Sequence, residues 1–209
     1  MNVANYGARG DGRADDTAAI NSAMSACVAP ALPHNGCVLY FPAGAYISTG
    51  LTLRSYVNMK GDGWGTSVLL LKPHTASDVL TVPVDAFNFS ISGLTLDGNS
   101  GRGGIGNCFF VAPTSTGPAE WNTANKRTAP VNAQKWGHVE EVMFSHCSVD
   151  GIHINAFNYM LFFDNFYAFD NGVYGIFAPP LTSASAWRKA TVAHRAVSNN
   201  KMTFGYSET

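Results

Sequence analysis

The sequence predicts an all-β fold in which short parallel strands stack as the turns of a solenoid, preceded by one helix. Short apolar runs alternate with corners rich in glycine, asparagine and proline, and no helical period separates them. Asp150-Gly-Ile and Tyr174-Gly-Ile stand 24 residues apart, which fits one turn built from three short strands. Charged residues make up only 13% of the chain and glycines number 21, which suits a turn-rich β protein better than a helical bundle.

The predicted helix runs from about Asp15 to Cys27. Residues 5–13 before it hold three glycines, which indicates a tight, irregular loop because glycine tolerates positive φ. An acidic residue at the start of a helix supplies a capping acceptor and suits the positive end of the helix dipole. Ile20, Met24 and Cys27 recur every three or four residues, so they share one face that must lie on something apolar.

Strand-like runs follow the helix in quick succession. Residues 68–71 are four apolar residues in a row, as expected of a strand with neighbours above and below it. Adjacent turns should pair as parallel strands about 4.8 Å apart. The predicted strands of the first half are residues 37–41, 46–53, 57–60, 68–71, 79–84, 87–91 and 94–96.

We expect one domain in two parts, a loop and capping helix over residues 1–36 and coils over residues 37–209. Residues 113–136 interrupt the repeat with three prolines and two tryptophans and show no period. We interpret them as an excursion that either walls a binding groove or packs as a solvated insertion. The chain stops at Thr209 in mid-repeat without a cap, so we expect a fragment, or an oligomer that covers the open edge.

Composition argues against several classes of partner. The net charge is −1 and no basic block is present, so we expect no nucleic acid as a partner. No apolar run reaches the roughly eighteen residues that a membrane span requires, so we expect no membrane partner. The predicted fold signature follows Met1-Asn-Val at once, so we expect no signal peptide.

The chain has four cysteines, Cys27, Cys37, Cys108 and Cys147. They form no CxxC pair, so a zinc site is not expected. Cys108 and Cys147 fall inside strand-like runs and read as small apolar core residues. We expect all four to be reduced and buried. The alternative is a disulfide between Cys27 and Cys37, which bracket the link between helix and first strand.

Four phrases stand out in the first half of the chain. They are Tyr6-Gly-Ala-x-Gly-Asp-Gly-x-x-Asp-Asp-Thr-x-Ala-Ile20, Val38-Leu-Tyr-Phe-Pro-Ala-Gly-x-Tyr46, Leu51-Thr-Leu-x-Ser-x-Val-x-x-x-Gly61-Asp-Gly, and Ile91-Ser-Gly-Leu-Thr-Leu-Asp-Gly-Asn99. Together they resemble the N-terminal signature of the pectate-lyase-like, right-handed parallel β-helix superfamily. The resemblance implies that the helix caps one end of a single-stranded β-helix, and that Asp11, Asp15 and Asp16 serve as caps and not as catalytic acids.

This N-terminal signature is shared by phage tailspikes, polysaccharide lyases, glycoside hydrolases and alginate C5-epimerases. The resemblance therefore implies that the partner is a polysaccharide, but it does not identify the reaction. We expect a polysaccharide-binding protein that cleaves its polymer as a lyase or a hydrolase, either as a secreted enzyme or as a tailspike depolymerase. Its expected location is extracellular or virion-associated, and a homotrimer is one open arrangement. The alternative is a structural or adhesive solenoid without an active site, and a C5-epimerase ranks behind both.

In this superfamily the substrate lies along one sheet and acids project from successive turns. By that logic Asp150 and His153 lie on one turn and Asp170 and Tyr174 on the next. If His153 faces outward, its neighbours Ile152 and Ile154 face the core. Asp150 and Asp170 could serve as acid and base in glycoside hydrolysis, whereas tyrosine and histidine could support a lyase. The alternatives are turn roles for the two aspartates and a solvated strand histidine.

The epimerase sheet motif reads Tyr-Gly-Phe-Asp-Pro-His, whereas this chain has Asp150-Gly-Ile-His-Ile-Asn155. The tyrosine, aspartate and histidine of the motif are all replaced, so we do not carry the epimerase activity over. We expect Asn155, with Trp121, Lys126 and Arg127 of the excursion, to contact the substrate. We expect no metal and no cofactor; calcium stays open, although no motif supports it.

Overall fold

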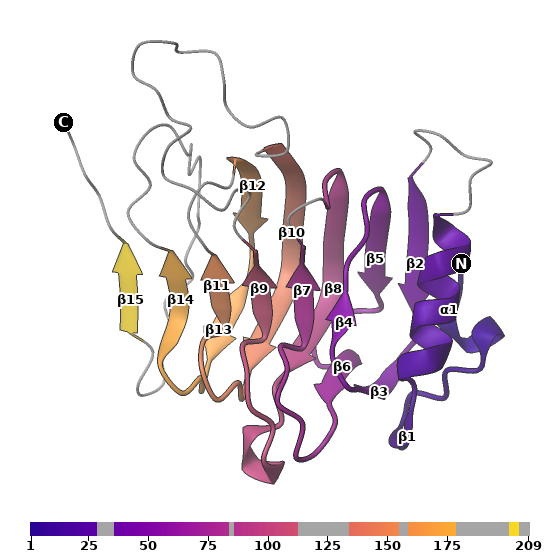
Figure 1. The fold of residues 1–209 in the computed structure, drawn as a ribbon, viewed down its shortest axis with the longest axis horizontal. Coiled ribbons are helices and arrows are strands. Elements are labelled where there is room, and N and C mark those ends of the chain that lie inside the picture. Colours follow the sequence, from indigo (N-terminus) through magenta and orange to yellow (C-terminus); the bar gives the residue numbers. More distant parts are fainter. Residues whose placement is uncertain (29–35, 84–85, 113–133, 155–158, 179–200, 205–209) are drawn as a thin grey trace.

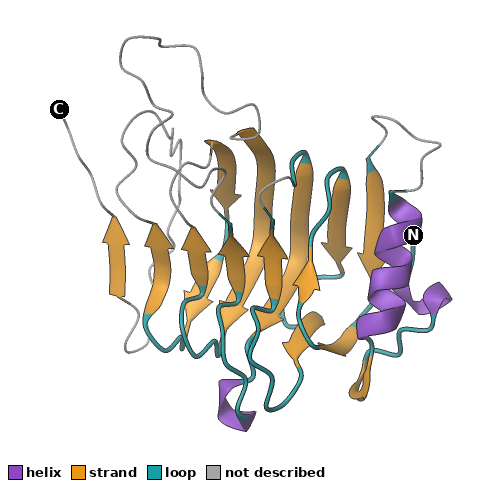
Figure 2. Ribbon diagram, viewed as in Figure 1, coloured by secondary structure: helices purple, strands orange, loops and turns teal. Residues whose placement is uncertain are grey.

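A computed structural model describes residues 1–28, 36–83, 86–112, 134–154, 159–178 and 201–204. The side chains of residues 134–136, 159–160, 178 and 201–204 lie outside this description. One α-helix, two short 3₁₀ segments and many short strands make up the described part (Figures 1 and 2). The elements are η1 Val3–Tyr6, β1 Asp11–Asp15, α1 Thr17–Cys27, β2 Cys37–Phe41, β3 Gly44–Ser48, β4 Leu51–Thr52, β5 Val57–Gly61, β6 Ser67–Leu71, β7 Leu80–Val82, β8 Phe89–Asp97, η2 Ser100–Arg102, β9 Phe109–Val111, β10 Gln134–Ser145, β11 Ile152–Ile154, β12 Tyr159–Asp164, β13 Tyr167–Phe169, β14 Tyr174–Ala178 and β15 Lys201–Phe204.

The described strands form two sheets, and every pairing between them is parallel. Sheet A has the order β1-β3-β6-β8-β10-β12, with β2, β5 and β13 joined to it. Sheet B has the order β4-β7-β9-β11-β14-β15. From β3 to β14 the chain alternates between the two sheets (Figure 1). We call one visit to sheet A followed by one visit to sheet B a pass, and each pass adds strands beside the equivalent strands of the previous pass. This confirms the predicted parallel pairing of successive turns.

The core lies between the sheets and consists of side chains stacked in register. The strand period of two points alternate residues inward, so each buried position meets its equivalent on the next strand. On sheet A the in-register stack is Leu39, Met59, Ile91, Val139 and Phe163, and on sheet B it is Leu51, Leu80, Phe109, Ile152 and Ile176. All ten side chains are buried, and each stabilises the fold by about 1.5–3 kcal/mol of transfer free energy.

The helix α1 packs against β2 at the N-terminal end of the sheets (Figure 1). Its predicted face is confirmed, because Ile20, Met24 and Cys27 are all buried. One capping expectation is confirmed and one is wrong. Asp15 accepts a hydrogen bond from Thr17 N at 3.1 Å and so caps the helix, but Asp16 makes no side-chain cap. The Asp16 carboxylate instead accepts from backbone N–H groups of the preceding loop, and it is buried there.

The expectation of four reduced cysteines is wrong. Cys27 bonds to Cys37 and Cys108 bonds to Cys147. The first disulfide links α1 to β2, which was the alternative considered from the sequence. The second was missed because Cys108 and Cys147 stand 39 residues apart, and only the stacking of passes brings their backbones within 5.5 Å.

The other sequence expectations concern boundaries and membranes. Residues 113–133, most of the expected excursion, lie outside the described residues, and residues 134–136 already belong to β10. Two strands expected at 87–91 and 94–96 are the single strand β8, with Gly93 at φ +62 inside it. In the part of the chain that the structure describes, no helix is long and apolar enough to cross a membrane.

Candidate functional site

The candidate site lies where the strands of sheet B begin, at corners that stack on one another. Each corner uses a side chain of one pass to hold the backbone of the next. Asp78 Oδ1 accepts hydrogen bonds from Asn107 N and Nδ2, at 2.9 and 2.8 Å. Asn107 Oδ1 accepts from Asp150 N at 3.1 Å, and Asp150 Oδ1 accepts from Tyr174 N at 3.0 Å. Polar side chains therefore fix these four corners in register.

Asp150 is the most constrained member of this series. Its side chain is only 3% exposed. One carboxylate oxygen accepts from Tyr174 N, while the other lies 2.7 Å from His153 Nδ1. Its backbone carbonyl accepts from Cys108 N at 2.9 Å. Asp150 thus has the turn role that we weighed as the alternative, and it also orients a histidine.

His153 projects outward from β11, as its predicted parity requires. Ile152 and Ile154 on either side of it are buried, whereas the His153 side chain is 23% exposed. An ionised carboxylate can only accept, so with Asp150 ionised and the imidazole neutral the contact places the ring proton on Nδ1. Nε2 then carries the lone pair. The ring is held in one orientation with a defined basic nitrogen.

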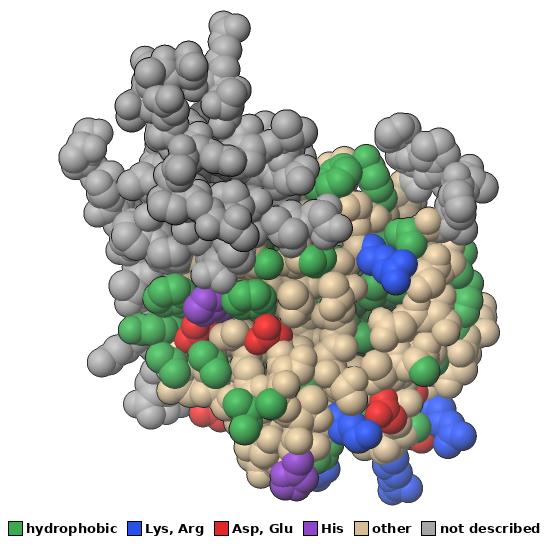
Figure 3. Space-filling view, viewed as in Figure 1, with side chains coloured by type: hydrophobic (Ala, Val, Ile, Leu, Met, Phe, Trp, Pro, Cys, Tyr) green, Lys and Arg blue, Asp and Glu red, His purple; other side chains and the backbone are tan. Residues whose placement is uncertain are grey.

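Aromatic rings on the neighbouring strands flank this imidazole. Phe110 on β9 and Phe177 on β14 are its direct register partners. The His153 ring stacks on Phe177 with centroids 4.7 Å apart and planes 26° apart, and the Phe110 ring lies at 5.4 Å and 33°. Figure 3 looks onto the face made by sheet B and shows a histidine between hydrophobic side chains, with acidic side chains beside it.

Tyr174 joins the same neighbourhood. Its backbone N–H is bound by Asp150, and its ring centroid lies 5.7 Å from that of Phe177. The 24-residue spacing that linked Asp150 with Tyr174 is therefore a real step from one pass to the next, with Ile152 paired to Ile176. The structure brings three predicted catalytic residues together: Asp150, His153 and Tyr174.

The fourth, Asp170, lies at a different corner. It follows β13 on sheet A, its side chain is 68% exposed, and its carboxylate is 3.6 Å from His146 Nε2. His146 Nδ1 is in turn 2.8 Å from Asp97 Oδ2. Asp170 therefore belongs to a second histidine cluster and does not form the predicted carboxylate pair with Asp150. Its φ of +53 also fits the turn role that we weighed.

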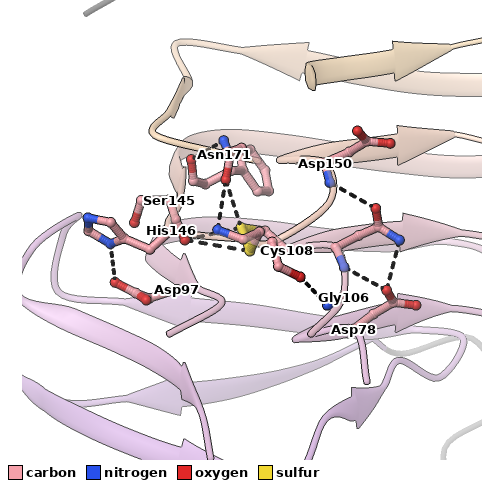
Figure 4. Close-up of a disulfide and its surroundings, with 12 residues drawn as sticks. Asp78, Asp97, Gly106, Cys108, Ser145, His146, Asp150 and Asn171 are labelled. Atoms are coloured by element: carbon pink, nitrogen blue, oxygen red, sulfur yellow. Dashed lines mark hydrogen bonds and ion pairs between the residues drawn. A yellow bond between two sulfur atoms is a disulfide. The ribbon is translucent and has the colours of Figure 1, made fainter. Parts of the chain in front are cut away.

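The Cys108–Cys147 disulfide lies between the two clusters (Figure 4). Cys147 follows His146 directly, and the backbone N–H of Cys108 donates a hydrogen bond to the backbone carbonyl of Asp150. The amide of Asn171 completes the junction, since Oδ1 accepts from Cys147 N at 3.1 Å and Nδ2 donates to Phe144 O at 3.2 Å. A buried covalent link and a buried amide thus hold the corner of Asp150 close to the corner of His146.

Four predicted substrate-binding residues, Asn155, Trp121, Lys126 and Arg127, lie outside the described residues. Sequence reasoning missed Phe110, Phe177 and Asn107, although a signal exists. Each stacked corner places its polar or aromatic corner residue three positions before an outward strand residue, as in Asp150 and His153 or Tyr174 and Phe177. Within the described ranges, no group of three or more histidine, cysteine, aspartate or glutamate side chains could hold a metal ion.

Comparisons with known proteins agree with this architecture. The family model described as "Rhamnogalacturonase A/epimerase, pectate lyase-like" matches residues 1–86. Mannuronan C5-epimerase AlgE2 of Azotobacter vinelandii is 40% identical over 111 residues, which are 47% of this chain and 11% of that protein. The chain therefore spans about a tenth of the length of this curated relative.

Solved structures extend the likeness beyond the first half. The A-module of the A. vinelandii mannuronan C5-epimerase AlgE4 superposes with a TM-score of 0.63 at 23% identity, covering 84% of this chain and 52% of the module. Tailspike protein 2 of an Escherichia coli O157:H7 bacteriophage superposes with a TM-score of 0.64 at 15% identity, covering 84% of this chain and 22% of that protein. At these identities the likeness concerns the fold. Together with the family model over residues 1–86 and the AlgE2 match, this likeness in fold confirms the resemblance to the pectate-lyase-like β-helix superfamily that the sequence predicted.

Proposed function

We propose that this chain binds a polysaccharide along the outer face of sheet B and cleaves it by β-elimination. The observation that carries the proposal is the Asp150–His153 pair, held on that face between Phe110 and Phe177. A histidine whose tautomer is fixed by a buried carboxylate has the geometry of a general base. Its partner Asp150 acts as a positioning residue.

The elimination requires a uronic acid polymer, because its ring carries a proton next to a carboxyl group. His153 Nε2 takes the C5 proton, the C4–O bond to the next sugar breaks, and a C4=C5 double bond forms. The leaving oxygen takes up a proton from water or from a tyrosine such as Tyr174. Electrons and atoms balance without an external oxidant. Mannuronan, the polymer for which the AlgE relatives are named, is such a uronate.

The arrangement favours a lyase over a hydrolase. Hydrolysis by a carboxylate pair needs two acids facing one glycosidic bond, about 5–9.5 Å apart. The Asp150 carboxylate is buried and occupied by Tyr174 N and His153, while Asp170 contacts His146 at another corner. The two aspartates therefore lack the shared solvent-facing site that such a hydrolase would use.

The rest of the proposal concerns assembly. We propose that the two sheets close into a right-handed, single-stranded parallel β-helix whose N-terminal end is capped by α1. The alternation of the chain between sheets and the likeness to AlgE4 and to tailspike protein 2 support this. The tailspike likeness also supports an extracellular or virion-associated location and a homotrimer, while the two disulfides suit an oxidising environment.

A non-catalytic polysaccharide binder is the second candidate. The observation that favours it is the structural role of Asp150. Its carboxylate accepts a hydrogen bond from Tyr174 N and its backbone carbonyl accepts one from Cys108 N, and neither contact requires catalysis. Such a binder would use the Phe110, His153 and Phe177 rings as an apolar strip and would leave its polymer intact.

The test incubates the full chain with polymannuronate, polygalacturonate and bacterial capsular polysaccharides. Elimination produces an ultraviolet-absorbing unsaturated end, hydrolysis produces reducing ends alone, and a binder produces neither. We expect unsaturated ends from at least one uronate polymer, and their loss in His153→Gln. His138→Gln, which changes an exposed histidine on β10 of sheet A, is the matched control. Equal activity in His153→Gln and wild type would refute the assignment of the base.

A further inference from the structure

We infer that the outer face of sheet A carries a second carbohydrate-binding surface, which takes neutral sugar residues. It consists of Trp64, Tyr167, Phe169 and the Asp97–His146–Asp170 cluster. The site goes beyond the proposed function, since it lies on the other sheet and none of its residues takes part in the elimination.

Contacts connect these residues into one patch. The Trp64 and Tyr167 rings meet with centroids 4.3 Å apart and planes at 51°. Tyr167 and Phe169 lie two residues apart on β13 and share its outer face, because Ala168 between them packs on the core. The Phe169 ring lies 5.4 Å from the His146 ring. A strip of partly exposed aromatic rings therefore leads directly to a cluster of polar side chains.

The aromatic end of the patch is held rigidly. Trp64 lies on the corner between β5 and β6, which folds over β8. Two hydrogen bonds fasten this corner, from Gly63 N to Gly93 O at 2.9 Å and from Gly65 N to Thr95 Oγ1 at 2.8 Å. Gly61 permits the close approach, since a Cβ there would lie 2.2 Å from Gly93 O. A ring that is already positioned loses little conformational freedom when a ligand stacks on it.

The polar end offers groups that suit sugar hydroxyls. The His146 side chain is 43% exposed and that of Asp170 is 68% exposed. His146 Nδ1 is occupied by Asp97, so the ring is oriented and its Nε2 edge faces Asp170 at 3.6 Å. That distance is longer than a hydrogen bond, which leaves both groups able to bind a hydroxyl pair.

The charges of the patch select the kind of sugar. Its carboxylates, Asp97 and Asp170, would repel the carboxylates of a uronate. Lys72 on the neighbouring pass is engaged with Asp15 at 2.9 Å. Apolar rings beside oriented carboxylate and imidazole groups match a neutral sugar, which has an apolar face and hydroxyls at its edge. This surface therefore differs in preference from the uronate site proposed on sheet B.

The test follows the indole N–H resonance of Trp64 in the full chain, assigned by its loss in Trp64→Phe. The chain has four tryptophans, so the spectrum is simple. The probes are cellohexaose, mannohexaose and maltohexaose as neutral sugars and hexagalacturonate as an anionic one. We expect at least one neutral hexasaccharide to shift the Trp64 signal, and hexagalacturonate to leave it in place.

Affinity is then compared among variants. We expect the Kd of the shifting hexasaccharide to rise about tenfold in Trp64→Ala, the loss of roughly 1.4 kcal/mol. Asp170→Asn should raise it about threefold. The matched control is Phe87→Ala, because Phe87 is an exposed ring of another aromatic pair, with Tyr56. It should leave the Kd within about twofold.

Three results would overturn the inference: no shift with any neutral hexasaccharide, an unchanged Kd in Trp64→Ala, or dissociation of an oligomer by Trp64→Ala in light scattering. The last result would assign the face to a second copy of the chain. Repeating the titration in His153→Gln separates the two proposals. The Trp64 shift should persist there, whether or not that variant loses polysaccharide cleavage.

Discussion

Two aspartate–histidine pairs, Asp97–His146 and Asp150–His153, differ in their surroundings. Figure 4 shows Asp97 and His146 on one side of the Cys108–Cys147 disulfide and Asp150 on the other. Asp150–His153 joins a buried carboxylate to a ring stacked between Phe110 and Phe177. Asp97–His146 has nearly the same Nδ1–carboxylate distance, 2.8 Å against 2.7 Å. Its histidine is almost twice as exposed, at 43% against 23%, and meets a second carboxylate at its other nitrogen.

The comparison indicates that an aspartate–histidine pair is not sufficient to identify a general base, because the surroundings of the histidine also matter. The His153 ring lies between Phe110 and Phe177, and within the described part of the chain no acidic side chain contacts its Nε2. The second carboxylate, Asp170, faces the corresponding nitrogen of His146. A histidine between two carboxylates is suited to hold a position or bind hydroxyls, and less suited to abstract a proton.

The largest expected effect is on catalysis. His153→Gln should reduce elimination by about 10²- to 10⁴-fold, the usual contribution of a general base. The glutamine preserves much of the volume between Phe110 and Phe177, so folding should survive. Initial rates of unsaturated-end formation on uronate polymers measure the loss. His138→Gln should retain wild-type rates, and a similar loss in that control would point to a nonspecific effect.

The next effect concerns the disulfide between the two pairs. Replacing Cys108 and Cys147 by alanine should lower the free energy of unfolding by about 4 kcal/mol, because a long loop in the unfolded chain is no longer closed. The same change at Cys27 and Cys37, which are 10 residues apart, should cost about 3 kcal/mol. Urea unfolding followed by circular dichroism measures both. Only the first variant should also impair cleavage, and unimpaired cleavage would mean that the disulfide does not hold the site.

A smaller effect tests the orienting role of Asp150. Asp150→Asn keeps an acceptor for Tyr174 N, but its amide N–H₂ faces His153 Nδ1 and favours the opposite tautomer. Cleavage should fall by about 10- to 100-fold, with kcat affected more than KM. The pH profile of kcat should also change. A loss confined to stability, with an unchanged pH profile, would reduce Asp150 to a corner residue.

The smallest expected effect is on the exposed ion pair between Asp15 and Lys72. Its contribution to stability serves as a reference for the exposed Asp97–His146 pair. A hydrogen bond from Thr17, aided by Lys72, lowers the pKa of Asp15 from 3.8 to about 2. Asp15 therefore stabilises the fold above its unfolded pKa of 3.8, and that contribution disappears as pH falls toward 2. The pair is exposed, so Asp15→Asn should cost less than about 1 kcal/mol at pH 7. Thermal unfolding at pH 7 and pH 2 measures this, and an equal cost at both would contradict it.

The sequence predicted the site in part. The alternation along β11 placed His153 outward, and the 24-residue spacing related Asp150 to Tyr174. It missed the flanking rings because equivalent corners recur at unequal intervals: Asp78, Asn107, Asp150 and Tyr174 are 29, 43 and 24 residues apart. Insertions between passes hide the equivalence of Phe110, His153 and Phe177, which only strand pairing reveals.

Asp170 illustrates the opposite error. Counting residues placed it one turn after Asp150, yet each turn visits both sheets, and Asp170 directly follows β13 of sheet A. Sequence distance along a coil does not say on which sheet a residue lies. Cys108 and Cys147 were misjudged for two reasons. Their apolar surroundings suit a free thiol as well as a disulfide, and their separation of 39 residues does not show that stacking brings them together.

By itself the sequence determined that the chain is made of short parallel strands with a helix at its start, because apolar periodicity and corner residues are local properties of the polypeptide. The tertiary structure alone decided which corners stack, which cysteines bond, and which of two aspartate–histidine pairs is enclosed by aromatic rings. These depend on the register between passes, which is set by how the core side chains of distant segments fit together.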